Sequence, residues 1–174
     1  MARVPSGVKM HDLVVRGGYA LFWSEWPSNW TCSPFTLNGK RYNCVEQYMM
    51  AEKARLFKDE RTLKKIMAAT DPADQKRYGR EVQGFDERKW SSVCFDVVLR
   101  GNLEKYRQNE ELCQKLLATG DLTFVEASPK DKIWGIGLDK NHKDATHPGK
   151  WQGKNLLGKV LDQARKTIRE ERGL

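Results

Sequence analysis

Two ionisable residues, Glu46 and Lys53, lie seven residues apart in a stretch with a helical pattern. Two turns of helix place them on roughly the same face, with a rise of about 10 Å between them. A carboxylate and an amine at that separation are suited to bracketing a ligand, and their neighbours include Tyr48, Met49 and Met50 rather than further charges. The alternative is a pair of solvated surface charges, which is the usual state of Glu and Lys.

A second group of polar residues follows a strand-like stretch that ends near residue 127. Glu126 and Asp131 precede Trp134 and Gly135. Carboxylates beside an aromatic wall suit general acid–base chemistry at a sugar carbon, and a glycine lets a ligand approach the backbone closely. The alternative is a turn that the side chain of Asp131 caps.

The glycine-rich segment 148–160 contains a partial phosphate-loop pattern, because Gly153 to Lys159 fits G-x-x-x-x-G-K. Val160 stands where a Ser or Thr would have to bind Mg²⁺, so we exclude a nucleoside triphosphatase. The segment instead predicts a helix that begins near Asn155. Free backbone N–H groups at this helix N-terminus would hold a phosphate, and the alternative is an ordinary helix cap.

The cysteines and histidines do not have the spacing of a zinc site. The nearest candidate, His142 with Asp144 and His147, lies in a polar segment that reads better as a solvated loop. We therefore expect no metal, and we expect no cofactor. The four cysteines include no C-x-x-C pair and are expected to be reduced and buried. They are Cys32, Cys44, Cys94 and Cys113.

Composition excludes several classes of protein. The 174 residues are 39% hydrophobic and 10% aromatic, too much for a disordered chain. The apolar runs are far shorter than the roughly 20 residues of a membrane helix, so we expect no membrane partner. The N-terminal residues lack the apolar run of a signal peptide. We expect an intracellular protein of the cytoplasm or the nucleus.

The charge balance favours a polyanionic ligand. Lys and Arg number 31 against 23 Asp and Glu, which gives a formal net charge of +8 at pH 7. Such an excess suits a nucleic acid, a nucleotide or a phosphorylated metabolite. The alternative is a solvated surface with a modest positive excess.

Local patterns predict an α+β fold, predominantly helical, in a single domain over residues 1–174 with its core at about 19–171. An Asn-Gly pair between two short β-prone runs predicts a hairpin over 35–42. Further strands are expected over 19–23, 122–127 and 133–138.

Apolar periodicity and capping residues predict six helices. They cover about 44–57, the residues after Asp59, Asp71 to about Val82, the residues after Asp86, Asn109 to Gly120 and about 155–171. The helix after Asp86 is expected to be long, with Trp90 facing inward and Gly101-Asn102 interrupting it. The last helix is expected to bury an apolar stripe from Leu156 to Ile168.

Taken together, these segments resemble the NADAR family, which is associated with NAD and ADP-ribose metabolism. The match covers about Phe22 to Arg165, and its specificity lies in the order and spacing of motifs that are weak singly. These motifs are Ser28-Asn29-Trp30, Ser33-Pro34-Phe35, Gly39, Tyr42, Glu46 to Ala54, Gly79 to Val82, Phe85-Asp86, Trp90, Gly101 to Tyr106, Thr119-Gly120-Asp121, Val125 to Ser128, Asp131, Trp134 to Gly137 and Asn155 to Gly158.

The resemblance implies an N-glycosidase, a hydrolase of the bond between ribose C1 and a nitrogen. The substrate that we expect is ADP-ribose attached to guanine, in DNA, RNA or a nucleoside. One alternative within the family is the phosphorylated ribosylamino-pyrimidines of early riboflavin synthesis. Another is a non-catalytic module that binds ADP-ribose or nucleic acid.

A chemical hypothesis that follows from the resemblance gives roles to individual residues, and the resemblance itself supports a lysine nucleophile. Lys53 is the expected nucleophile, which would form a Schiff base with ribose C1, and Glu46 and Asp131 are the expected acid–base pair. The expected substrate-binding residues are aromatic, basic or amide side chains and one glycine. They are Trp23 for base stacking, Trp90 and Trp134 as pocket walls, Arg80 and Lys154 with the backbone near Asn155 for phosphates, Asn102 for ribose hydroxyls, and Gly135.

Overall fold

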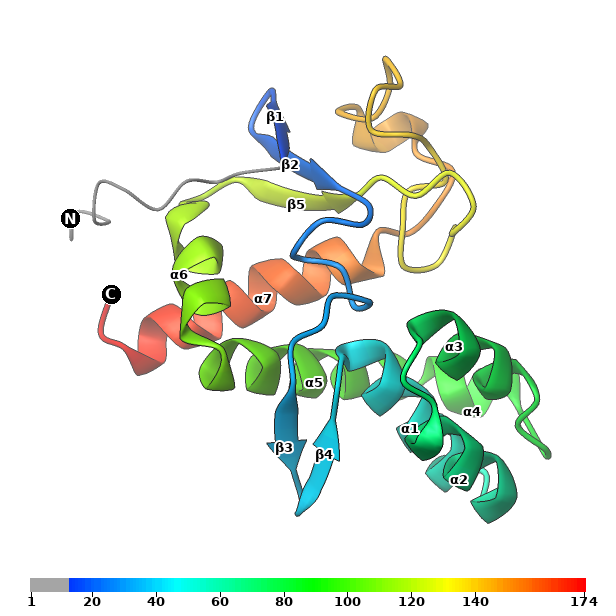
Figure 1. The fold of residues 1–174 in the computed structure, drawn as a ribbon. Helices are drawn as coiled ribbons and strands as arrows, with labels where there is room; N and C mark the ends of the chain where they lie inside the picture. Colours follow the sequence, from blue (N-terminus) through cyan, green and yellow to red (C-terminus); the bar gives the residue numbers. More distant parts are fainter. Residues whose placement is uncertain (1–12) are drawn as a thin grey trace. The chain divides into compact units, whose positions relative to one another are not determined.

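Figure 1 shows the fold of the chain in a computed structural model that describes residues 13–174. These residues form two compact units, residues 13–28 with Glu110–Leu174, which we call unit 1, and Asn29–Asn109, which we call unit 2. Each unit combines helices with a small sheet, which confirms the predominantly helical α+β class. A single domain over 1–174 stays a prediction. The N-terminal residues that lack a signal-peptide pattern lie outside the described residues.

The sheet of unit 1 has three short strands, β1 (Val14–Arg16), β2 (Tyr19–Phe22) and β5 (Thr123–Glu126), in the order β1-β2-β5. β1 pairs with β2 in antiparallel fashion, and β2 pairs with β5 in parallel. β2 and β5 confirm two expected strands. β1 was not predicted, although Gly17 and Gly18 both have the positive φ that a tight hairpin requires.

The helices of unit 1 are α6 (Glu110–Ala118) and α7 (Leu156–Glu171), with a 3₁₀ turn at Pro148–Lys150. α7 packs along β5 and also contacts α6 (Figure 1). The expected apolar stripe of α7 is buried from Leu157 to Ile168. Gly120 follows α6 with a φ of +57°, as expected for a helix C-terminus.

The strand that we expected over 133–138 is wrong. Ile136 donates one backbone hydrogen bond to the carbonyl of Glu126 at 2.9 Å, and Gly137 donates to the carbonyl of Asp131 at 3.2 Å. Gly137 has a φ of +71°, which is outside the strand region. The alternation of apolar residues and glycines therefore produces an irregular loop. Ile136 bonds to Glu126 at the end of β5, but Gly137 and the residues before it bond to Asp131 within the loop, so no strand ladder continues.

At Gly158, helix α7 approaches β5 closely. A Cβ atom at this position would overlap the carbonyl oxygen of Phe124 and the side chain of Asn155. We expect Gly158→Ala to lower the free energy of unfolding by about 1–3 kcal/mol, since backbone must move to relieve the overlap. Denaturant titration measures this loss. The control is Gly149→Ala, where a Cβ atom meets nothing within 4 Å; an equal loss in both variants would contradict the packing argument.

Unit 2 begins with the predicted hairpin. β3 (Phe35–Leu37) pairs with β4 (Lys40–Tyr42) in antiparallel fashion. Asn38 and Gly39 have φ values of 52° and 70°, the positive values that a two-residue hairpin turn requires. This turn was predictable because both its residues tolerate that backbone region without help from the rest of the chain.

Three helices follow the hairpin, α1 (Val45–Leu56), α2 (Glu60–Ala68) and α3 (Pro72–Arg80), and all three pack against one another. The predicted caps are confirmed. Asp59 accepts a hydrogen bond from the backbone of Thr62 at 3.0 Å, and Asp71 accepts one from Ala73 at 2.8 Å.

The long helix expected after Asp86 is two helices, α4 (Glu87–Ser91) and α5 (Cys94–Gln108). Asp86 caps α4 by accepting a hydrogen bond from Lys89 at 2.9 Å, as predicted. The break falls at Val93, which has a φ of −124°. Trp90 is half-buried rather than part of a continuous inward face.

The expected interruption at Gly101-Asn102 is wrong, because both residues lie inside α5. A Cβ atom on Gly101 would lie 2.7 Å from Cδ1 of Tyr48, so this glycine permits the close approach of α5 to α1. Asn102 is fully buried, and its amide donates to the carbonyl of Val98 at 3.0 Å. Both residues serve packing between helices, a role that local propensity does not show.

The four cysteines are thiols, as expected, and form no disulfide. Three of them are buried, but Cys32 is exposed in the loop before β3. The expectation that all four are buried is wrong for this residue, because a loop position offers no apolar environment to a thiol.

Candidate active site

The residues that we expected to act on substrate fall into both units, and each group is described within its own unit. Unit 2 holds Glu46, Lys53, Arg80, Trp90 and Asn102, and unit 1 holds Trp23, Asp131, Trp134, Gly135, Lys154 and Asn155.

Helix α1 carries Glu46 and Lys53, as predicted. A residue outside the helix satisfies one N–H group of its first turn, because the backbone N–H of Glu46 donates to the carbonyl of Asn29 at 3.0 Å. The side chain of Gln47 accepts from the backbone of Asn43 at 2.8 Å and so caps the chain just before the helix. Glu46 is only 3% exposed, so it is not the solvated surface charge of the alternative interpretation.

Lys53 is half-buried, and its surroundings lower the pKa of its side-chain amine. Burial lowers the pKa of the Lys53 ammonium below its usual range. The positive charge of Arg80 adds to this lowering, whereas the carboxylate of Glu46 opposes it. The structure therefore brings Lys53, Glu46 and Arg80 within electrostatic reach of one another, with Arg80 exposed at the end of α3.

Asn102 connects α5 with the start of α1. Its amide donates to the side-chain oxygen of Asn29 at 3.1 Å, and the carbonyl of Asn29 in turn accepts from Glu46. The side-chain oxygen of Asn102 is buried and accepts no hydrogen bond from residues 13–174. A buried acceptor without a protein donor is suited to a ligand hydroxyl, although Asn102 also has a clear structural function through Asn29.

Trp90 lines a hollow in unit 2. Residues of α1 and of the start of α5 complete the lining, which does not include Lys53. The other lining residues are Glu52, Arg55, Leu56, Val93 and Val97. The expected role of Trp90 as a wall beside Lys53 stays a prediction.

In unit 1, Asp131 caps a turn. One of its carboxylate oxygens accepts hydrogen bonds from the backbone N–H groups of Ile133 at 2.9 Å and of Trp134 at 2.8 Å. This geometry is the turn that we considered as the alternative. The other carboxylate oxygen is the part of Asp131 on which an acid–base role depends, and that role stays a prediction.

Gly135 lies where the protein's own backbone leaves no room for a side chain, and its substrate-binding role stays a prediction. A Cβ atom at Gly135 would lie 2.9 Å from the carbonyl oxygens of Asp131 and Glu126. The backbone that comes close to this glycine is therefore that of its own loop and of the end of β5. Trp134, its neighbour, is half-buried.

The N-terminus of α7 does not offer the free N–H groups that we expected. Backbone carbonyls of residues 132–135 accept from Lys154, Asn155, Leu156 and Leu157 at 2.9–3.2 Å. The side chain of Asn155 is buried and bonds to β5, accepting from Glu126 at 3.0 Å and donating to Phe124 at 2.9 Å. The prediction that these four backbone N–H groups bind a phosphate is therefore wrong. The side chain of Lys154 is exposed, so its positive charge is the part of the predicted phosphate site that stays available.

Trp23 is 45% exposed and projects from the end of β2. Its backbone N–H donates to the carboxylate of Glu25 at 2.7 Å, and the same carboxylate forms an ion pair with Lys140. Burial raises the pKa of Glu25, but the hydrogen bonds from Lys140 and Trp23 outweigh it and leave this pKa below its usual value. Glu25 is thus charged at neutral pH and fixes the backbone that presents the exposed indole.

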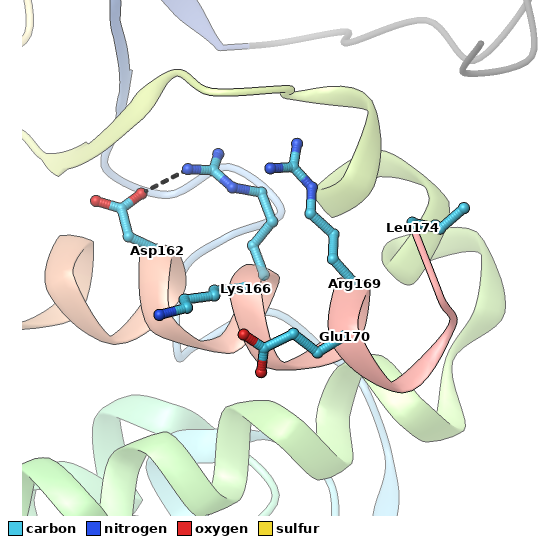
Figure 2. Close-up of a pocket in the computed structure, with 6 residues that line it drawn as sticks. Asp162, Lys166, Arg169, Glu170 and Leu174 are labelled. Carbon is cyan, nitrogen blue, oxygen red and sulfur yellow. Dashed lines mark hydrogen bonds and ion pairs between the residues drawn. The ribbon is translucent and has the colours of Figure 1, made fainter. Parts of the chain in front are cut away.

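A hollow along α7 in unit 1 contains none of the predicted residues (Figure 2). Arg165 and Arg169 approach it, but their guanidinium groups already have partners. Arg165 bonds to Asp162 and Thr119, and Arg169 bonds to Asp121. These contacts tie α7 to the end of α6 and to the start of β5.

The comparisons with known proteins agree with this architecture. The NADAR domain matches residues 21–169. The chain belongs to the NADAR family. An N-glycosidase of Acanthamoeba polyphaga mimivirus is 49% identical to it over 138 residues, which cover 78% of this chain and 79% of the viral protein.

Two further NADAR relatives are bacterial. The N-glycosidase YbiA of Escherichia coli is 30% identical over 83% of this chain and 82% of its own length. Its solved structure matches 92% of this chain and 90% of that chain with a TM-score of 0.74 and 28% identity. A riboflavin biosynthesis protein of Vibrio vulnificus is 34% identical over 80% of this chain but only 34% of its own length. The expectation of an enzyme that hydrolyses N-glycosyl bonds is confirmed by the N-glycosidase relatives.

Two residues of this NADAR chain were missed by sequence reasoning. Phe85 places its ring 4.3 Å from Nζ of Lys53, measured to the ring centroid. Lys105 is fully buried in α5, and burial lowers its pKa to about 7, against the opposing effect of Cys44. Phe85 stood within the motifs of the resemblance, but nothing in its type or spacing indicated a contact with Lys53.

Between residues 13 and 174, no group of three or more His, Cys, Asp and Glu side chains is arranged to hold a metal ion. His142 and Asp144 bond within their own loop, where Asp144 also pairs with Lys150 at 3.1 Å. None of the helices in the same range has both the length and the apolar character that a bilayer crossing requires.

Proposed function

We propose that this NADAR protein removes ADP-ribose from guanine in nucleic acid by hydrolysing the bond between ribose C1 and the base. The observation that carries the proposal is the environment of Lys53, a half-buried amine with a lowered pKa within electrostatic reach of the buried Glu46. Lowering its pKa raises the fraction of neutral amine at neutral pH, and only the neutral amine is a nucleophile.

The reaction that these groups support has two stages. The neutral amine of Lys53 attacks ribose C1, and the bond from C1 to the guanine nitrogen breaks with its electron pair on the base. Glu46 in its acid form supplies the proton that the base takes up. The amine then loses a proton, and the C1–O bond of the ribose ring opens with its electrons on the ring oxygen, which takes that proton. The product of this stage is a protonated Schiff base between Lys53 and C1.

Water completes the reaction. It adds to C1 of the Schiff base and gives its proton to Glu46, which restores the acid. The bond between C1 and Lys53 then breaks with its electron pair on nitrogen. The oxygen that water supplied forms a double bond to C1, and its proton moves to the nitrogen, which leaves Lys53 as a neutral amine. ADP-ribose and the unmodified base are the products, and the protein ends in its starting state.

Charge and exposed aromatic side chains support an ADP-ribosyl group on nucleic acid. The net charge of +8 attracts phosphates. In unit 2 the exposed Arg80 brings a permanent cation to the surroundings of Lys53, suited to a diphosphate. In unit 1 the exposed Trp23 offers a face on which a base can stack.

The test uses an oligonucleotide that carries ADP-ribose on one guanine, with product release followed by mass spectrometry. We expect free ADP-ribose and the unmodified oligonucleotide in equal amounts. The matched control is Glu46→Gln, which keeps size and hydrogen bonding but removes the acid, and it should lower the rate by about 10²–10⁴-fold. Absence of release by the unaltered protein at any salt concentration would overturn this substrate.

A second candidate substrate has one specific observation in its favour, because a relative is named a riboflavin biosynthesis protein. The same lysine and acid would then cleave the N-glycosyl bond of phosphorylated ribosylamino-pyrimidines. A parallel assay with such a compound distinguishes the two. Turnover of the pyrimidine without release from the oligonucleotide would replace the first substrate with the second.

A further inference from the structure

The turn between α3 and α4 places an aromatic ring on the proposed nucleophile. Phe85 is 46% exposed, and its ring centroid is 4.3 Å from Nζ of Lys53. The same ring meets the ring of Phe57 edge to face, with centroids 5.4 Å apart. Because the side chain of Phe85 is nearly half exposed, it contributes little to the hydrophobic core of unit 2. Core packing therefore does not explain why its ring lies over the amine of Lys53.

This turn is held in place by a separate set of contacts. One carboxylate oxygen of Asp59 caps α2, and the other accepts a hydrogen bond from the backbone of Gln83 at 2.9 Å. The hydrogen bonds from Gln83 and Thr62 lower the pKa of Asp59 to about 2, so the anchor is charged at every pH at which the enzyme would work. Gly84 in the same turn has a φ of +70°, a value that glycine adopts without strain.

We propose that Phe85 is a positioning residue that covers Lys53, holds its amine at a fixed place beside Glu46 and helps to set its protonation. This inference rests on the proposed role of Lys53 as the nucleophile. It extends that role to a residue that does not itself contact the breaking bond.

Two physical effects of the ring act on the amine in opposite directions. The apolar cover excludes water and disfavours the ammonium form. The negative face of the ring attracts the ammonium and favours it. The charged groups that act on Lys53 from its own helix and from α3 are Glu46 and Arg80, and neither changes when Phe85 is replaced.

Two substitutions separate these effects. Phe85→Leu keeps an apolar cover but removes the aromatic face, so we expect the pKa of Lys53 to fall by about half a unit. Phe85→Ala removes the cover, so we expect this pKa to rise by about one unit toward the usual value. Phe85→Tyr keeps both the apolar cover and the aromatic face, so the pKa of Lys53 should be the same as in the unaltered protein.

The measurement is the pH dependence of labelling of Lys53 by an amine-selective acylating reagent, read by peptide mass spectrometry. It needs no substrate. Lys76, which lies 5.8 Å from the ring of Trp30, is the internal control, and its labelling profile should be the same in all variants. Thermal unfolding verifies that each variant is folded.

Shifts of opposite sign in Phe85→Leu and Phe85→Ala, with Phe85→Tyr unchanged, would establish the positioning role. Unchanged labelling of Lys53 in both variants, or shifts of the same sign, would overturn it. The proposed function fails separately: if Lys53→Met retains full turnover while the labelling shifts appear as expected, Phe85 covers a lysine that is not the nucleophile. The acidic limb of the turnover profile should move with the labelling pKa in each variant.

Discussion

Lys53→Met should lower kcat/KM by at least about 1,000-fold, because an enzyme that works through a covalent intermediate loses its main route when the nucleophile is removed. Borohydride added during turnover should trap a ribosyl adduct on the unaltered protein and none on the variant. Mass spectrometry of the digested protein locates the adduct on Lys53 and measures both outcomes.

Two controls sharpen this expectation. Lys53→Arg keeps a positive charge, but a guanidinium cannot be deprotonated in a protein, so it should be as inactive as Lys53→Met if the neutral amine is what matters. Lys58→Met changes an exposed lysine just beyond the same helix and should leave the rate within about twofold. A trapped adduct that persists in Lys53→Met would assign the nucleophile to another lysine.

Lys105→Met should raise the free energy of unfolding by about 3 kcal/mol at pH 6, the largest gain that we expect from a single substitution in this protein. Lys105 is fully buried, and its pKa of about 7 in the fold lies well below the usual lysine value near 10.4. The folded protein is therefore destabilised when the amine of Lys105 is protonated. Methionine has a similar length and no charge, so it avoids this cost.

The pH dependence of this gain follows from proton linkage. Between about pH 7 and pH 10.4 the unfolded chain binds a proton at Lys105 that the folded protein does not, so the stability of the unaltered protein rises with pH. Below pH 7 both states are protonated and the destabilisation is complete and constant. The advantage of Lys105→Met should therefore be largest below pH 7 and should shrink steadily toward pH 10.

Urea unfolding of both proteins at a series of pH values measures this difference. Tyrosines and other groups that titrate at high pH are common to both proteins and cancel in the comparison. Lys64→Met, at an exposed position of α2, is the matched control and should show no such trend. A gain that is absent at pH 6, or that is the same at every pH, would contradict the linkage argument.

Some features of this fold were readable from short stretches of sequence. The Asn38-Gly39 turn, the Asp59 cap and the apolar stripe of α7 depend on interactions within a few residues, and each is confirmed. The spacing of Glu46 and Lys53 belongs to the same class, because two turns of one helix place both residues on one face whatever surrounds them.

Other features depended on residues that are far apart in the chain. Gly101 was expected to break a helix, yet it is a helical residue at the approach of α5 to α1. The N–H groups at the start of α7 were expected to be free, yet carbonyls of residues 132–135 accept their hydrogen bonds. In both cases the position was recognised as unusual from its sequence, but the distant residues that it contacts were not predicted. These are Tyr48 for Gly101 and residues 132–135 for the start of α7.

The sequence by itself therefore determined the fold class, the local turns and caps, and the pair of residues on α1 that the proposed chemistry requires. Only the tertiary structure decided that Lys53 is half-buried under Phe85, that Lys105 is buried completely and that Gly158 is a packing residue. The physical reason is that local propensity acts over one or two turns of chain. Desolvation, close packing and the pKa of a buried amine depend instead on neighbours from distant segments, which the one-dimensional pattern does not specify.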